Sequence, residues 1–286
     1  MEVIALFVLS SWSAPINNPQ QPDKIDVTQM PIALKELLEL EQNTPLGERI
    51  DQNSQLMLGL PYLFDAIGEE QLPDEDPLFR YDGYDCLTFV EQTLAFSLAK
   101  DSVDFENIVL SMRYSTGPSY VSRNHFMLSQ WVPNALDKNY FEDVTHSIGP
   151  TRTVQKKLIQ RNWDRWKGRH RYHLQPEDYP KGDFILEIVP IDVLTFSIEK
   201  LQTGDLLIVV RENNPYNPVL ITHLGWYIDA EIPTLRHATK MGAGGVRDDS
   251  LIWYLNHLHY SDKWPIAGFL VLRPVDTNLR LENENP

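Results

Sequence analysis

The sequence predicts an α+β fold in which helices come first along the chain and an antiparallel β-sheet follows. Apolar residues recur every three or four positions in the first half, whereas short aliphatic runs separated by Gly, Pro and Asn fill the second half. The 286 residues are 42% hydrophobic and include seven Trp, which is enough to bury one large core. We therefore expect the sheet to pack against helices of the first half, and in particular against the helix that carries the single cysteine.

Helical periodicity predicts two helices at the start of the domain, over 32–40 and 50–67. A third helix is expected from Cys86 to about Lys100, because Leu87, Val90, Leu94 and Leu98 form one apolar stripe. Asp85 is a good N-cap for this helix, since its carboxylate can accept hydrogen bonds from the free amides of the first turn. Further helical periodicity covers 108–114 and 126–136.

Strands of the antiparallel sheet are expected over 184–189, 206–210, 219–228, 235–238 and 266–272. The segment 156–179 is polar and rich in Arg, Lys, His and Trp, and we interpret it as an insertion without a place in this scheme. Its two basic-aromatic clusters, 162–166 and 169–173, either touch a ligand or form a solvated loop anchored by tryptophans.

The N-terminal residues resemble the end of a secretory signal peptide, because an apolar run over 3–9 precedes a stretch of small residues and Pro15. The run is too short to span a bilayer, and no other stretch approaches the ~20 apolar residues required, so we expect no membrane span. We predict an exported protein, periplasmic or secreted. The expected organisation is a signal-peptide remnant (1–14), a mobile leader (15–28), a single domain (29–278) and a tail (279–286).

The acidic composition limits the partners of the protein. A formal net charge of -15 repels nucleic acid and anionic membrane surfaces, so we expect no nucleic-acid partner. A single cysteine excludes an internal disulfide and any metal site with two thiolates. His257 and His259 lie in a sequence context that looks helical, where a spacing of two does not place both on one face, and we expect neither a metal nor a cofactor.

Cys86 is the candidate nucleophile, because a helix N-terminus stabilises a thiolate and its amides can donate to an oxyanion. A lone cysteine is otherwise a small buried hydrophobe. The candidate base is His223, which shares one face of its strand with Gly225 and Tyr227, although a core histidine fits the same pattern. His237 lies 14 residues further on, a span suited to a hairpin partner that fixes the tautomer of His223, or else it is a half-exposed strand residue.

These motifs resemble those of the NlpC-like cell-wall cysteine peptidases, above all their N-acetylmuramoyl-L-alanine amidase-like branch. The resemblance rests on an ordered set: Asp85-Cys86-Leu87-Thr88-Phe89-Val90-Glu91, Gly204-Asp205-Leu206-Leu207 leading into Thr222-His223-Leu224-Gly225, and His237-Ala238-Thr239. It covers roughly residues 45–275. The resemblance implies a papain-like fold with Cys86, His223 and His237 as nucleophile, base and orienting residue. It also implies peptidoglycan or muropeptide fragments as the substrate.

The same resemblance suggests residues of a substrate cleft. Tyr62 ends a Gly-x-Pro-Tyr stretch that is similar to the one ahead of the family's catalytic helix, and Asp85 matches a residue that can touch a ligand amine. Asn124 and His125 lie in a stretch that looks like part of the amidase-like branch. Each of Tyr62, Asn124 and His125 fits simple packing as well.

One departure from the family pattern bears on which bond is cleaved. The better-known endopeptidases have Ser-Gly after the cysteine, whereas this chain has Leu87 and Thr88. We therefore favour the muramoyl-L-alanine amide over the bond that follows D-glutamate. Two other hypotheses stay open: a cysteine acyltransferase or deamidase that acts on a protein, and a non-catalytic wall-binding protein that kept the fold. The oligomeric state is not predicted.

Overall fold

The computed structural model describes residues 28–32, 44–259 and 264–276. The predicted signal peptide, leader and tail, and nearly all of the predicted helix over 32–40, lie outside these residues. The α-helices are α2 (Leu46–Gln55), α3 (Cys86–Leu98), α4 (Ser102–Arg113), α5 (Val132–Asp137), α6 (Thr145–Ile148), α7 (Gln160–Arg165), α8 (Ile191–Thr195) and α9 (Leu251–His259). Shorter helical turns are η1 (Tyr120–Ser122), η3 (Lys167–Arg171) and η4 (Ile198–Lys200), and η2 (Met127–Trp131) is a π-helix.

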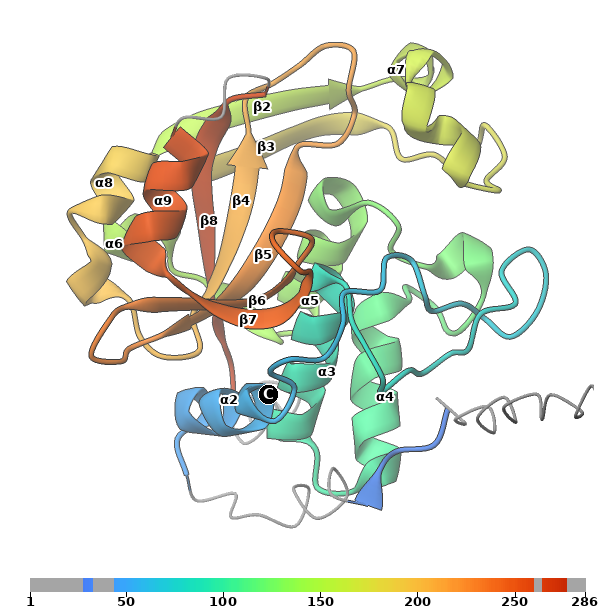
Figure 1. The fold of residues 1–286 in the computed structure, drawn as a ribbon. Helices are drawn as coiled ribbons and strands as arrows, with labels where there is room; N and C mark the ends of the chain where they lie inside the picture. Colours follow the sequence, from blue (N-terminus) through green and yellow to red (C-terminus); the bar gives the residue numbers. More distant parts are fainter. Residues whose placement is uncertain (1–27, 33–43, 260–263, 277–286) are drawn as a thin grey trace, which may run out of the picture.

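Two antiparallel sheets are formed by β1 (Phe141–Asp143), β2 (Arg152–Leu158), β3 (Gly182–Ile188), β4 (Leu206–Arg211), β5 (Ile221–Ile228), β6 (Thr234–Thr239), β7 (Gly245–Ser250) and β8 (Ile266–Pro274). The larger sheet has six strands in the order β1-β8-β4-β5-β6-β7. Helices cover both of its faces, with α3 and α4 on one side and α8 and α9 on the other (Figure 1). The predicted α+β class with an antiparallel sheet is confirmed.

The alternation of residues along β5 explains the two hydrophobic cores. Leu224 and Trp226 are fully buried on the side of α3, where they join Phe89 and Leu94 of that helix. Tyr227, the next residue of the strand, packs on the other side among residues of α9. Successive side chains of a strand point to opposite faces, so one eight-residue strand contributes to both layers.

Helix α3 begins where the sequence predicts, because Asp85 caps it. The Asp85 Oδ1 atom accepts from the amides of Leu87 (3.1 Å) and Thr88 (2.9 Å), and the Thr88 hydroxyl accepts from the Asp85 amide (3.0 Å). This reciprocal capping box satisfies amides that would otherwise lack partners. Cys86 is thereby fixed as the first residue of the helix.

The predicted helix over 50–67 is wrong beyond Gln55, which is the last residue of α2. Gly59 adopts a positive φ of 84°, and its amide donates to Val246 O (2.9 Å), while the Val246 amide donates to Leu60 O (2.9 Å). The chain therefore runs along the edge of β7 in an extended form. The spacing of apolar residues here reflects contacts of an irregular segment, which periodicity alone does not distinguish from a helix.

The polar insertion also differs from its expected form. Strands β2 and β3 pair with each other from Arg152↔Ile188 to Leu158↔Gly182 in a separate sheet, so the predicted strand over 184–189 exists but does not belong to the main sheet. We call residues 152–188 the arm. Trp163 is fully buried in an aromatic cluster with Phe126 and Tyr179, and this part of the arm is therefore a packed structure instead of a solvated loop.

The two N-caps offer a test of this local structure. Asp101 caps α4 by accepting from Val103 N (3.0 Å) and Asp104 N (2.9 Å), in the same way as Asp85 caps α3. We expect Asp101→Ala and Asp85→Ala each to lower the free energy of unfolding by about 1 kcal/mol, because two amides lose their acceptor. Urea denaturation measures both. A change close to zero for Asp85→Ala would contradict the capping role.

Candidate active site

The Cys86 thiol lies where α3 meets the sheet, and it is half-buried. Burial, reinforced by the negative charge of Asp85, raises the pKa of the Cys86 thiol to about 12, although hydrogen bonds from the backbone amides of Leu224, Cys86 and Leu87 act in the opposite direction. The helix N-terminus alone therefore does not hold this cysteine as a thiolate. For such a thiol to act as a nucleophile, a neighbouring base has to accept its proton.

The Leu224 amide reaches the thiol because β5 is unpaired along part of its edge. Strands β5 and β6 pair only from Trp226↔Arg236 to Ile228↔Thr234, although β5 begins at Ile221. Residues that precede Trp226 in β5 are thus free to face the start of α3. His223 directly precedes Leu224, so the strand that contacts the thiol also carries the predicted base.

A chain of hydrogen bonds runs from His223 across the sheet. The distance between His223 Nε2 and His237 Nδ1 is 2.7 Å, and His237 Nε2 lies 3.0 Å from Asp249 Oδ2 on β7. Arg247 in turn donates to the other Asp249 oxygen, with 2.9 Å between Nε and Oδ1. His237 is fully buried and Asp249 nearly so. The structure therefore brings His223 and His237 together and adds an acidic residue that the sequence analysis did not identify.

The direction of these hydrogen bonds assigns the tautomers of both rings. A carboxylate only accepts, so His237 Nε2 carries the proton that it donates to Asp249. A neutral His237 then has a lone pair on Nδ1, which accepts from the Nε2 proton of His223. The remaining nitrogen of His223, Nδ1, is left unprotonated. The hydrogen bond from His237 to Asp249 thus leaves Nδ1 of His223 able to accept a proton.

Burial keeps the two imidazoles neutral. It lowers the pKa of His223 to about 3, and the positive charge that His237 would carry acts in the same direction. Burial also lowers the pKa of His237, although the hydrogen bond to Asp249 raises it. The Tyr254 ring of α9 packs edge-on against His237, with 5.3 Å between the ring centroids. The centroid of the same ring lies 6.1 Å from that of His223. Burial therefore favours the uncharged forms of the Cys86 thiol and of both imidazoles.

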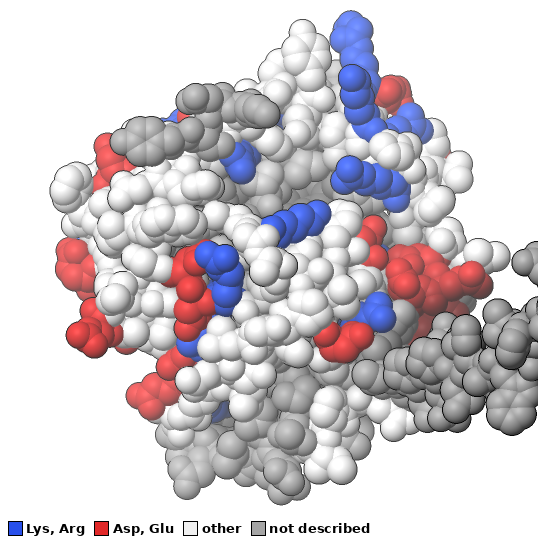
Figure 2. Space-filling model, in the orientation of Figure 1, with Lys and Arg blue, Asp and Glu red and all other residues white. Residues whose placement is uncertain are grey.

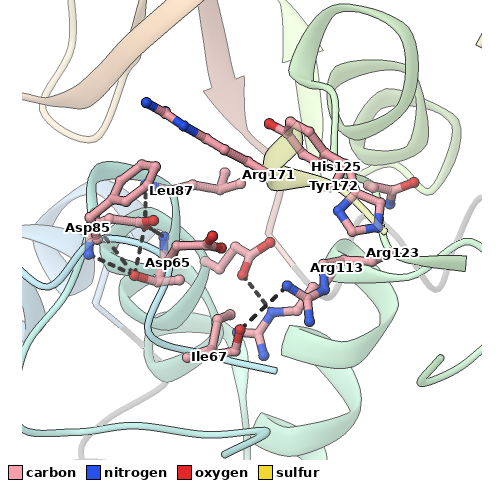
Figure 3. Close-up of a pocket in the computed structure, with 13 residues that line it drawn as sticks. Asp65, Ile67, Asp85, Leu87, Arg113, Arg123, His125, Arg171 and Tyr172 are labelled. Atoms are coloured by element: carbon pink, nitrogen blue, oxygen red, sulfur yellow. Dashed lines mark hydrogen bonds and ion pairs between the residues drawn. The ribbon is translucent and has the colours of Figure 1, made fainter. Parts of the chain in front are cut away.

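A cavity of about 190 Å³ lies beside the first turn of α3 (Figure 3). Its walls come from a loop, from the cap and first turns of α3, from the segment around residue 124 with Arg113, and from the arm. The lining residues are Phe64, Asp65, Ile67, Asp85, Leu87, Thr88, Glu91, Arg113, Arg123, Asn124, His125, Arg171 and Tyr172. Three predicted substrate residues, Asp85, Asn124 and His125, are among them. Cys86, His223 and His237 do not line the cavity. Asp85 and Leu87, the residues on either side of Cys86 in the chain, do line it.

The predicted cleft residues differ in their burial and in their hydrogen-bond partners. Asn124 is buried and its side-chain amide donates to Met112 O (2.9 Å), so it supports the wall. His125 Nε2 lies 2.6 Å from Tyr120 O, which leaves Nδ1 for the cavity side of the ring. Tyr62 is outside the lining but close to the thiol. Burial raises the pKa of its phenol, and the charges of Cys86 and Asp85 raise it further.

Sequence reasoning missed Asp249 and Phe64, whereas Arg171 and Tyr172 belong to the 169–173 cluster, for which contact with a ligand was one of two alternatives. For Asp249 a signal did exist, because β7 continues the hairpin that begins with His237, and an acidic residue on the next strand can reach that histidine. Phe64, Arg171 and Tyr172 lie in segments without regular periodicity, and nothing in their spacing indicates a shared cavity.

Other site types are not found in the described residues. Within 28–32, 44–259 and 264–276, no group of three or more His, Cys, Asp or Glu side chains is arranged to hold a metal ion. His257 lies in the last turn of α9 and stacks on Trp253 with 5.3 Å between ring centroids. None of the described helices combines the length and apolar character of a membrane span.

The chain belongs to the N-acetylmuramoyl-L-alanine amidase-like family, whose model matches residues 52–260. This confirms the resemblance that the sequence motifs indicated. A Legionella pneumophila protein has a similar fold, with a TM-score of 0.74 and 23% identity over 85% of this chain and 95% of that one. An N-acetylmuramoyl-L-alanine amidase from Bacteroides uniformis is similar with a TM-score of 0.64 and 20% identity, over 80% of this chain and 98% of that one. No curated protein matches the chain in sequence.

The buried histidine of the cavity makes stability depend on pH. Burial lowers the pKa of His125 to about 4, below the value of about 6.5 expected in the unfolded chain. Between these pH values the unfolded state binds a proton that the folded state does not. The free energy of unfolding is therefore highest above pH 6.5 and decreases as the pH falls toward 4.

The free energy of unfolding of wild type should fall between pH 7 and pH 5. We expect this fall to be about 1 to 2 kcal/mol smaller in His125→Gln. Chemical denaturation at the two pH values measures this difference. The exposed neighbour His173 gives the control, since His173→Gln should follow wild type. Parallel pH dependence of wild type and His125→Gln would show that His125 titrates normally in the fold.

Proposed function

We propose that the protein is a cysteine-dependent amidase that hydrolyses the amide between N-acetylmuramic acid and L-alanine in peptidoglycan or its fragments. The observation that carries this proposal is the buried chain from Asp249 through His237 to His223, which ends on the strand that contacts Cys86. Membership of the amidase-like family supports the choice of bond. The placement of the thiol at the start of a helix packed on an antiparallel sheet supports the papain-like description.

In this mechanism the Cys86 proton passes to Nδ1 of His223 as the sulfur attacks the muramoyl carbonyl carbon. Negative charge develops on the carbonyl oxygen, beside the backbone amide of Cys86, which does not donate to Asp85 as the Leu87 and Thr88 amides do. The carbon–nitrogen bond breaks when His223 returns the proton to the leaving amine of L-alanine, and a thioester remains. Water then loses a proton to His223 and attacks the thioester, which releases the muramic acid carboxyl group and the thiol.

The raised pKa of the thiol means that its proton must be removed during attack, and the lowered pKa of His223 means that this ring is unprotonated and can accept it. Proton transfer takes place together with attack, because a preformed thiolate–imidazolium pair is disfavoured in this buried site. His237 and Asp249 are positioning residues that keep the accepting nitrogen free. The proposal also places the protein in an exported compartment, where its substrate is found.

Removal of the nucleophile tests the reaction directly. We expect Cys86→Ala to abolish cleavage of purified muropeptides, while the fold is retained because the substitution removes one atom from a half-buried side chain. Mass spectrometry of the products should show free stem peptide beginning at L-alanine with wild type only. A fully active Cys86→Ala protein would refute the mechanism, and cleavage after D-glutamate would make the protein an endopeptidase. Absence of any cleavage would argue for a protein substrate or a binding role.

Replacement of Asp249 tests the assigned tautomers. In Asp249→Asn the amide can donate to His237 Nε2, which moves the His237 proton to Nδ1 and prevents that atom from accepting from His223. We expect kcat to fall at least about tenfold with little change in KM. His237→Ala should retain a fraction of the activity.

The exposed Asp183 of β3 provides a matched control, since Asp183→Asn makes the same chemical change away from the site. Thermal melting checks that both variants are folded, because Asp249 also binds Arg247. Equal kcat values for the two variants would remove Asp249 from the mechanism.

A further inference from the structure

The arm contributes one wall of the cavity beside Cys86. Arg171 and Tyr172 lie at the end of η3, and both line the cavity together with residues of the helical half. In Figure 3 the Arg171 side chain extends across the cavity toward the side where Leu87 and Asp85 lie. A segment that the proposed reaction does not use thus reaches the neighbourhood of the nucleophile.

Aromatic packing holds this part of the arm in place. The Tyr172 ring contacts His125 edge-on, with 5.7 Å between centroids, and Phe126 at 5.0 Å. The next backbone amide, that of His173, donates to the Tyr120 hydroxyl (3.1 Å). Arg171 is therefore attached to a fixed backbone although its own side chain is exposed.

Arg171 is the cation of this cavity that remains available to a ligand. Arg123 is paired with Glu69 (2.7 Å) and Asp74 (2.8 Å), and Arg113 donates to the buried Glu91 (3.0 Å). Among the described residues, no hydrogen bond or ion pair involves the Arg171 side chain. The buried Nη2 atom of Arg113 also lacks a hydrogen-bond partner there, so the cavity offers donors at its floor and at its rim.

The arm is the basic part of an acidic protein. Between residues 156 and 171 it has seven Lys or Arg and one Asp, in a chain whose formal charge is -15. Figure 2 shows basic side chains gathered at the upper right, over the end of the arm that carries α7.

The position of the cavity indicates which half of a substrate it receives. His223 must protonate the leaving amine, so the leaving peptide lies on the side of β5. None of the cavity's lining residues comes from β5, β6 or β7. The cavity is lined instead by Asp85 and Leu87, the two chain neighbours of Cys86, which makes it the candidate site for the acyl half of the substrate. In the proposed reaction that half is the muramoyl sugar.

The lining suits a saccharide. The carboxylates of Asp65 and Asp85 accept from hydroxyl groups, the Arg171 guanidinium donates to hydroxyl and acetamido oxygens, and the rings of Phe64 and Tyr172 offer apolar surface to a pyranose face. We propose that Arg171 and Tyr172 complete a subsite for the N-acetylmuramoyl ring, in which Arg171 determines specificity for the sugar. This inference rests on the proposed function.

The test compares two substrates that share the scissile amide. One is N-acetylmuramoyl-L-alanyl-D-isoglutamine, and the other replaces the sugar by D-lactate alone. We expect wild type to favour the muramoyl substrate in kcat/KM by at least about tenfold, because contacts remote from the reacting bond contribute to the transition state. Arg171→Ala should lower kcat/KM for the muramoyl substrate about tenfold and leave the lactoyl substrate nearly unchanged, and Arg171→Lys should fall between.

Arg165 provides the matched control, because it is an exposed arginine of the same arm that lies outside the cavity lining. Arg165→Ala should behave as wild type with both substrates. A loss below about threefold for Arg171→Ala with the muramoyl substrate, or an equal loss with both substrates, would overturn the subsite while the amidase function stands. Failure of wild type to cleave either compound would overturn the proposed function and this inference with it.

Discussion

Burial of the cysteine-bearing helix against the sheet is the constraint on which the other features of the site depend. Eleven of the thirteen residues of α3 are buried, so the helix is fixed along its length and its first residue cannot shift. Its buried carboxylate, Glu91, is satisfied by Arg113 (3.0 Å) and by Trp131 Nε1 (2.9 Å). These contacts join α3 to α4 and to η2, and they help to hold the start of α3 beside β5.

The same burial determines the electrostatics of the site. In an environment with little water a thiolate and an imidazolium are both costly, so Cys86 and His223 are stable as neutral groups. An uncharged site needs its proton-accepting nitrogen to be defined by hydrogen bonds instead of by charge. The chain through His237 to Asp249 supplies that definition, and it depends on the pairing of β6 with β7, where His237 lies opposite Arg247.

In the function that we propose, the arm and the first turn of α3 together give the site its selectivity. The arm packs through an aromatic cluster on Tyr120 and Phe126, so a segment with a basic, polar sequence has a rigid base. In a protein of net charge -15, long-range attraction to an anionic polymer is weak, and recognition depends on a specific cavity. The arrangement of Arg171 beside paired arginines meets this requirement, because only an unpaired cation is available to a ligand.

The sequence by itself determined the local features: the cap at Asp85, the helix that begins at Cys86, most strands of the main sheet, and the family. Each depends on backbone hydrogen bonds or on side-chain alternation within a few residues, which is information that a short segment contains. Only the tertiary structure decided that α2 ends at Gln55, that β2 and β3 form a separate sheet, that Asp249 completes the hydrogen-bond chain, and that Arg171 and Asp85 line the same cavity. These features depend on contacts between segments that are distant in the chain, and packing selects such contacts after the local elements have formed.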